Sequence, residues 1–168
     1  MTPSPQQQAR RQQVNEELCA AALRAITGDA GLHYQGRRLY QGKRYLPVHA
    51  PHLRQAPDNF DFEQTRAAAD GLAMRVLRSD AQLHRQLCPI DPVQRLIFEW
   101  LEQLRVESLV EAGLRGVQLN LHQRFLLWSR EFYRTGHTKS RHGMLLYTAA
   151  QMCWSRLMSK PEIGRAHV

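Results

Sequence analysis

The sequence lacks the features that mark several large classes of protein. It has only three cysteines, Cys19, Cys88 and Cys153, which stand far apart and form no C-x-x-C pair. This odd, scattered set argues against a disulfide framework or a cysteine zinc site, and it fits a reducing compartment. The longest apolar-rich stretch, residues 144–154, is too short and interrupted to span a bilayer, and residues 1–7 contain no apolar signal segment. We therefore expect a cytoplasmic protein that does not enter a membrane.

Catalytic motifs are also missing. No G-x-S-x-G occurs, and no spacing implies a Cys–His pair. Residues 36–44 resemble a phosphate-binding loop only superficially, because five residues separate Gly36 from Gly42 where a P-loop has four, and Arg44 stands where the motif has Ser or Thr. A basic hairpin tip is the favoured interpretation. We expect no catalytic residue in this chain.

The eight histidines do not form a zinc-protease pattern, which needs two histidines four apart on a helix with a carboxylate between them. His49 and His52 are close in sequence, as are His137 and His142, but both pairs lie in predicted loops. His84 and His122 each stand alone on a predicted helix. We expect no metal ligand among them and no cofactor bound by this chain.

Positive charge is the main compositional bias, with a formal net charge of +8 and a pI of about 10. Such a field favours acidic partners: nucleic acid, an anionic membrane surface or an acidic protein segment. The arginines are scattered along the chain, which favours an ordinary solvated surface. The aromatic residues fall on predicted core faces, so a nucleic-acid-binding regulator is only an alternative hypothesis.

Hydrophobic periodicity predicts a mainly all-α fold, a bundle of about five to six helices with a small β-hairpin insertion. We expect a disordered tail over 1–7, a helical domain over 8–160 and the hairpin and loop insertion near 32–58. The first helix should bury Val14, Leu18, Ala22 and Ile26 and end at Gly28.

Later helices follow the same logic. Asp91-Pro92 is a strong helix start. The alternating Glu and Arg residues between Glu99 and Glu111 suggest either a solvated, ion-paired helix face or a seam to a neighbouring helix. The final helix, from about Arg141 to Ser159, should bury a line of residues that includes Leu145. The tryptophans at 100, 128 and 154 lie on apolar stripes and are predicted to belong to the core.

Residues 161–168 need separate treatment. Their run Glu-Ile-Gly-Arg-Ala-His-Val is what one reading frame of a common sequencing-library adapter encodes. We interpret this tail as non-native and expect the natural chain to continue past Pro161.

Four ordered motifs resemble the cobaltochelatase T family (CobT), over roughly residues 20–157. They are Ala25-Ile26-Thr27-Gly28-Asp29, the R-x-x-A-D-x-x-A-x-R stretch of residues 66–75 with Asp80, His84 and Leu87 after it, Glu102-Gln103-Leu104-Arg105-Val106-Glu107, and Gly116-Val117 with Asn120-Leu121. Between residues 32 and 57 the similarity is poor.

The resemblance implies a role in the aerobic route to cobalamin. Members of the family pair with an AAA+ ATPase subunit (CobS), and that complex acts on a large subunit (CobN), which inserts cobalt into hydrogenobyrinic acid a,c-diamide using ATP. ATP, Mg and cobalt would then belong to the complex and not to this chain. The family's acidic middle region and its von Willebrand A-like domain have no counterpart here, and no D-x-S-x-S occurs.

The matched polar residues are candidates for a partner-facing or structural polar network. They are Arg75, Glu102, Gln103, Arg105, Glu107 and Asn120. Pairing within a helix and packing between helices would explain the same residues. A generic helical protein-interaction domain from another system is the other alternative to a chelatase subunit.

Overall fold

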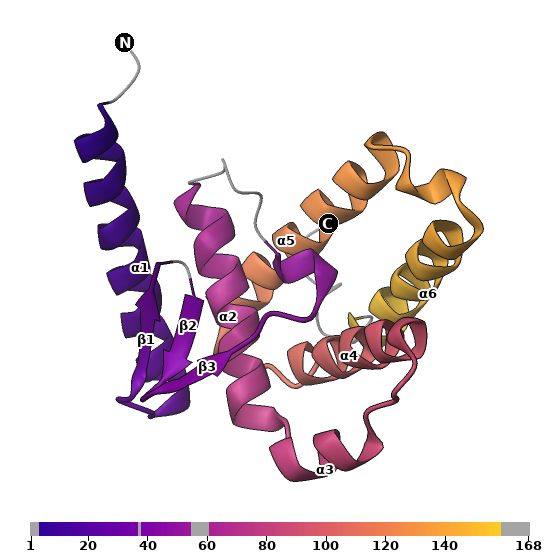
Figure 1. Cartoon of the computed structure of the whole chain (residues 1–168), viewed down its shortest axis with the longest axis horizontal. Helices are drawn as coiled ribbons and strands as arrows, with labels where there is room; N and C mark the ends of the chain where they lie inside the picture. Colours follow the sequence, from indigo (N-terminus) through magenta and orange to yellow (C-terminus); the bar gives the residue numbers. More distant parts are fainter. Residues whose placement is uncertain (1–3, 37, 55–60, 159–168) are drawn as a thin grey trace, which may run out of the picture.

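The computed structural model describes residues 4–36, 38–54 and 61–158. Within them the chain is mainly α-helical with one small antiparallel sheet, as the periodicity predicted (Figure 1). The helices are α1 (Pro5–Thr27), α2 (Phe62–Arg78), α3 (Ala81–Leu87), α4 (Pro92–Glu107), α5 (Arg115–Arg134) and α6 (Arg141–Met158), with 3-10 turns η1 (Pro51–Leu53) and η2 (His137–Lys139). The predicted non-native tail, residues 161–168, lies outside the described residues.

Helix α1 begins earlier than predicted and buries a different face. Ser4 and Gln7 form a capping box, each side chain bonding the other's backbone N–H, so the helix starts inside the segment predicted to be a tail. Val14 and Leu18 are exposed, whereas Cys19 and Leu23 are fully buried with Ala20 against α2 and the sheet. The every-fourth-residue pattern was correct, but the buried stripe lies one position further along the chain.

The predicted hairpin insertion is confirmed, and it has a third short strand. β1 (Leu32–Gln35), β2 (Arg38–Gln41) and β3 (Arg44–Leu46) pair antiparallel in that order. Gly36 and Gly42 occupy left-handed backbone conformations in the two turns, which glycine adopts without a steric penalty. Leu32 and Leu39 are buried, so one face of the sheet joins the core. The part of the insertion at 55–58 lies outside the described residues.

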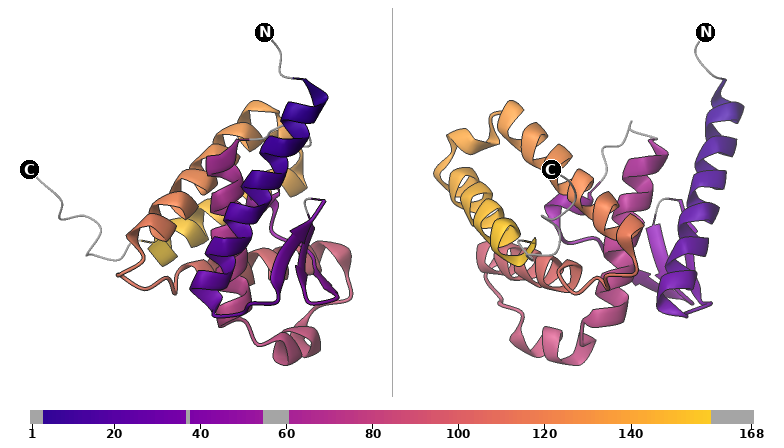
Figure 2. Two further views of the ribbon diagram at one scale, coloured as in Figure 1. Left: turned by 90° about the vertical axis from the view of Figure 1, so that its left-hand side faces the viewer. Right: turned by 180° about the vertical axis from the view of Figure 1, so that it is seen from behind.

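Helix α2 is the centre of the molecule. It contacts α1, α4, α5 and η1, with α1 and the sheet on one side and α5 and α6 on the other (Figures 1 and 2). Its middle is rich in small residues and is buried from Ala67 to Met74, which lets its neighbours approach closely.

Aromatic side chains fill the space between α4, α5 and α6. Trp154 stacks on Phe125 with ring centroids 4.1 Å apart, and Trp128 meets Trp100 edge to face at 4.6 Å. Trp100 and Trp154 are buried and Trp128 packs against them, so the prediction that all three tryptophans belong to the core is confirmed. On α6 the predicted stripe is wrong in one respect, since Leu145 is exposed.

Helix starts are fixed by three aspartates. Asp61, Asp80 and Asp91 each accept hydrogen bonds from backbone N–H groups of the first turn of α2, α3 and α4, respectively. These bonds lower the pKa of the Asp80 carboxyl below its usual value. None of the helices in the described part of the chain is long and apolar enough to cross a membrane.

Candidate functional site

The polar side chains that the sequence singled out lie mostly at the interface of α2 with α4. Glu99, Gln103 and Glu107 are four residues apart and therefore share one face of α4, which points inward. All three are buried, with 5 %, 3 % and 2 % of their surface exposed. Of the two interpretations of these carboxylates, the seam to a neighbouring helix is confirmed for Glu99 and Glu107, and the solvated face is wrong for them. Helix α4 ends at Glu107, before Glu111.

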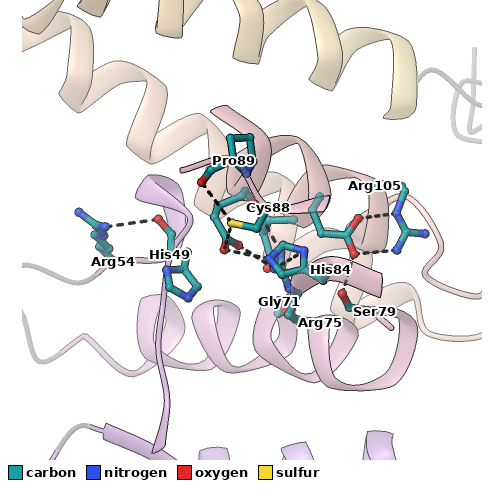
Figure 3. A network of polar contacts seen from close by, with 12 residues as sticks. His49, Arg54, Gly71, Arg75, Ser79, His84, Cys88, Pro89 and Arg105 are labelled. Atoms are coloured by element: carbon teal, nitrogen blue, oxygen red, sulfur yellow. Dashed lines mark hydrogen bonds and ion pairs between the residues drawn. The ribbon is translucent and has the colours of Figure 1, made fainter. Parts of the chain in front are cut away.

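One end of this face opens into a cleft of about 570 Å³ between the sheet, α2, α3 and α4. There Arg75 Nη2 donates to Glu99 Oε2 at 2.7 Å, and His84 Nε2 lies 2.9 Å from Glu99 Oε1 (Figure 3). Cys88, at the end of α3, lies beside the same carboxylate with Sγ 4.0 Å from Oε1. His84, which stood alone on its predicted helix, thus has a carboxylate and a thiol as neighbours.

The short helix α3 makes this arrangement possible. Asp80 starts it, and its C-cap Cys88 precedes Pro89, which has no N–H to continue a helix. His84 and Cys88 are four residues apart, one turn along α3. The chain then returns through the Asp91 cap to α4, which carries Glu99 back toward α3.

Ionisation of Glu99 is favoured despite its burial. Burial alone would raise the pKa of its carboxyl, but the hydrogen bond from His84 and the positive charge of Arg75 more than offset that effect, and the pKa lies below its usual value. His49, which lines the same cleft, has its pKa lowered, chiefly by burial. The cleft therefore combines a carboxylate anion with imidazole groups and a thiol.

The other end of the α4 face is buried away from solvent. His52 Nε2 lies 2.9 Å from Glu107 Oε1, Gln103 Nε2 donates to the same oxygen at 2.8 Å, and Trp100 Nε1 lies 2.9 Å from His52 Nδ1. Because the indole N–H can only donate, His52 Nδ1 must accept, which places the imidazole proton on Nε2, facing Glu107. The His52 ring is therefore neutral, and each of these polar atoms has a partner. Gln103 also donates to the carbonyl of Gly71 on α2.

The remaining predicted residues occupy two further places. Arg105 donates to Glu102 at 2.6 Å and to the carbonyl of Arg78, on the outer side of α4, and Glu102 also accepts from Ser79. Burial alone would raise the Glu102 pKa, but these two donors keep it below its usual value. Asn120, on α5, donates to the buried Asp70 of α2 at 2.7 Å.

The six predicted residues thus form four separate groups instead of one network, and the interpretation as helix-to-helix packing accounts for most of their contacts. Sequence reasoning missed Glu99, His52, Asp70 and Cys88 as partners. The spacing of Glu99, Gln103 and Glu107 beside the apolar Trp100 was a usable signal for an inward polar face. Nothing local could reveal His52, which lies 48 residues before Trp100.

A second cleft, of about 670 Å³, lies beside α5 and η1. The buried Arg124 lines it, donating to Gln64 Oε1 at 2.8 Å and to the carbonyl of Arg54. Burial lowers the pKa of this guanidinium, with an opposing effect from the charge of Asp61. Arg124 therefore joins α5 to η1 and α2.

Comparison with known protein families identifies the chain's relatives. A family model described as "Cobalamin biosynthesis protein CobT" matches residues 10–153. The chain belongs to the CobT family. The match spans most of α1, the sheet and most of α6, so all six predicted polar residues lie within the part shared with CobT proteins. No solved structure matches this CobT chain.

Proposed function

We propose that this CobT-family chain is a non-catalytic part of an ATP-dependent aerobic cobaltochelatase in the cytoplasm. It would assemble with the AAA+ subunit CobS and support the large subunit CobN, which inserts cobalt into hydrogenobyrinic acid a,c-diamide. ATP, Mg and cobalt would be bound by the complex. The observation that carries the proposal is the family match over residues 10–153, which spans nearly all of the described helices.

The distribution of polar groups supports a scaffold role. Gln103 and Glu107 make hydrogen bonds inside the protein, and Asn120 makes one between α5 and α2. Groups of this kind fix how helices pack, which suits a scaffold. We assign a structural role to these three residues of the predicted network.

We assign the partner-facing part of the predicted polar network to the outer side of α4. The Arg105 side chain is 48 % exposed while held against Glu102, and Arg78 pairs with the exposed Glu111 next to it. Guanidinium groups held in place by carboxylates lose little conformational entropy when a partner binds. We infer that this surface, formed by Arg78, Glu102, Arg105 and Glu111, contacts CobS.

A binding experiment tests this assignment. The 168-residue chain is immobilised and its affinity for purified CobS, alone and with CobN, is measured. We expect specific binding, weakened several-fold by Arg105→Ala. Arg134→Ala is the matched control, because Arg134 also bonds a glutamate three residues earlier, Glu131, and is 73 % exposed. Absence of binding to either subunit would refute the proposed function, and equal effects of the two variants would refute the choice of surface.

Net charge suggests a mechanism for the encounter. A chain with a formal charge of +8 would attract an acidic segment of its own subunit or of a partner through long-range electrostatics. The association rate with CobS should then fall as ionic strength rises, since salt screens such steering. A rate that does not change with salt would contradict this mechanism while leaving the assembly role intact.

The same charge is the observation behind the second candidate, a basic nucleic-acid-binding regulator. Binding to random DNA with a steep salt dependence, together with no affinity for CobS, would favour it. Failure to bind both, with capture of an unrelated protein, would favour a generic helical interaction domain.

A further inference from the structure

The cleft between the sheet, α2, α3 and α4 contains a cluster that the assembly role does not explain, formed by His84, Cys88 and Glu99. Their imidazole nitrogen, thiol sulfur and carboxylate oxygen all lie within 4.8 Å of one another. His84 and Cys88 are one turn apart on α3 and at its C-cap, and the fold brings Glu99 of α4 to them. His84 and Glu99 are largely shielded from solvent, with 14 % and 7 % of their side chains exposed.

Their spacing is close to that of a tetrahedral metal site. Zinc bonds of about 2.0–2.3 Å at tetrahedral angles place a nitrogen and an oxygen ligand roughly 3.4 Å apart, and a sulfur and an oxygen ligand roughly 3.6 Å apart. Here His84 Nε2 lies 2.9 Å from Glu99 Oε1, and Cys88 Sγ lies 4.0 Å from the same oxygen. Shifts of about half an ångström would bring each of these two pairs to a coordinating separation. The His84 nitrogen and the Cys88 sulfur, which lie within 4.8 Å of each other, must in addition come to roughly 3.6 Å.

We propose that His84, Cys88 and Glu99 bind a divalent transition-metal ion of the zinc type. Imidazole, thiolate and carboxylate together suit zinc and its neighbours in the first transition row and do not suit Mg²⁺ or Ca²⁺, which prefer oxygen ligands alone. Three protein ligands leave the fourth coordination position open. All three residues line the 570 Å³ cleft, so that position faces a space large enough for water or a small ligand.

The surrounding charges agree with this assignment. Arg75 Nη2 donates to Glu99 Oε2 at 2.7 Å, which leaves Oε1 for the metal and orients the carboxylate, the usual arrangement around a metal ligand. The Arg75 contact with His84 Nε2, at 3.0 Å, gives way when that nitrogen coordinates the ion. The two anionic ligands, Glu99 and the Cys88 thiolate, outweigh the positive charge of Arg75, which is in direct contact with the cluster. Arg44, Arg85 and Arg95 also line the cleft.

Metal binding changes which groups of the cluster carry a proton. The Cys88 thiol loses its proton to solvent, and the metal takes its place beside Glu99 Oε1. His84 coordinates through Nε2 as a neutral ring, so the proton that Nε2 donates to Glu99 before binding passes to Nδ1 by exchange with solvent. No electron is transferred, and no group other than the released proton leaves the site.

Optical titration with cobalt(II) tests the site, with cobalt serving as a spectroscopic substitute for zinc. The full chain, freed of metal with a chelator, should take up one equivalent and show a near-ultraviolet thiolate-to-cobalt charge-transfer band, which zinc then removes. Cys88→Ser should abolish the band and weaken binding at least tenfold. Glu99→Gln should weaken binding at least tenfold. Cys153→Ser is the control, because Cys153 is also partly exposed but lies on α6, outside the cluster.

The variants are checked by far-ultraviolet circular dichroism. Glu99 also holds Arg75, so if Glu99→Gln fails to fold, Cys88→Ser, a change of one atom, decides the question. Absence of saturable binding by the wild-type chain would overturn the proposal and leave the cluster as an ion-paired link between α2, α3 and α4. A band that survives in Cys88→Ser, or disappears in Cys153→Ser, would overturn it too. The titration uses no other subunit, so its result is independent of the proposed function.

Discussion

Replacement of His52 by leucine should be among the most destabilising single changes in this protein. The imidazole is fully buried, accepting from Trp100 Nε1 and donating to Glu107. Leucine fills a similar volume, so the change removes two hydrogen bonds without opening a large cavity. The groups left behind are an indole N–H and a carboxylate whose side chain is 0 % exposed, neither of which water can reach.

The size of the effect follows from those two groups, of which Glu107 keeps its bond from Gln103. A buried neutral donor without a partner costs about 1–3 kcal/mol, and loss of a bond to a charged group costs about 1.5–3 kcal/mol. We therefore expect His52→Leu to lower the free energy of unfolding by about 3–5 kcal/mol, a large share of the roughly 5–15 kcal/mol of an ordinary domain. With a denaturant dependence of about 2 kcal/mol per M urea, the midpoint should fall by roughly 2 M.

Urea unfolding followed by tryptophan fluorescence measures this loss. His33→Leu is the matched control, since His33 lies exposed on β1 and its replacement should cost no more than about 0.5 kcal/mol. Trp100→Phe combined with His52→Leu should cost less than the two single changes added together, because both remove the same hydrogen bond. If His52→Leu cost no more than the control, the assignment of a satisfied, stabilising network would be refuted.

Three further outcomes follow from the structure. Gly71→Ala should destabilise the protein by about 1 kcal/mol or more in thermal unfolding, because the new methyl group would lie 2.8 Å from a Leu53 side-chain carbon and alanine's better helix propensity offsets only part of that crowding. Cys19 should not react with a thiol reagent at pH 8 until the chain unfolds, because burial raises its pKa to about 11, whereas the two partly exposed cysteines should react in the native state. Glu99 has a lowered pKa in the folded state, so its ionised form stabilises the protein above its unfolded pKa of about 4.3 and that contribution is lost as the pH falls through the folded pKa. The difference in unfolding free energy between wild type and Glu99→Gln should accordingly be constant above about pH 5 and shrink below pH 4.

Much of the fold could be predicted from local signals. The helix start at Asp91 and the stop at Gly28 are properties of a few neighbouring residues, and the structure confirms them. The start of α1 was missed because Pro and Gln at a chain end read as a tail, although Ser4 and Gln7 already had the spacing of a capping box.

The burial of polar side chains could not be predicted in the same way. Glu and Gln every fourth residue on a helix describe a solvated face as well as an inward one, and only the partner decides between them. For Glu107 that partner is His52, which lies 55 residues away in a segment without regular helical periodicity. Cys88 was likewise unremarkable in sequence, because its neighbour Glu99 belongs to the next helix.

A single helix face accounts for both the sealed and the open polar groups. Glu99 and Glu107 are separated by two helical turns on the inward side of α4, and each is buried beside a histidine at 2.9 Å. Their settings differ in one respect: Glu107 is enclosed by Trp100, Gln103 and α2, whereas Glu99 borders the cleft. In the enclosed site every donor already has its acceptor, so a substitution there acts through stability. At the cleft a thiol and an open space adjoin the carboxylate, so Cys88→Ser should leave unfolding nearly unchanged while altering what the cleft can bind.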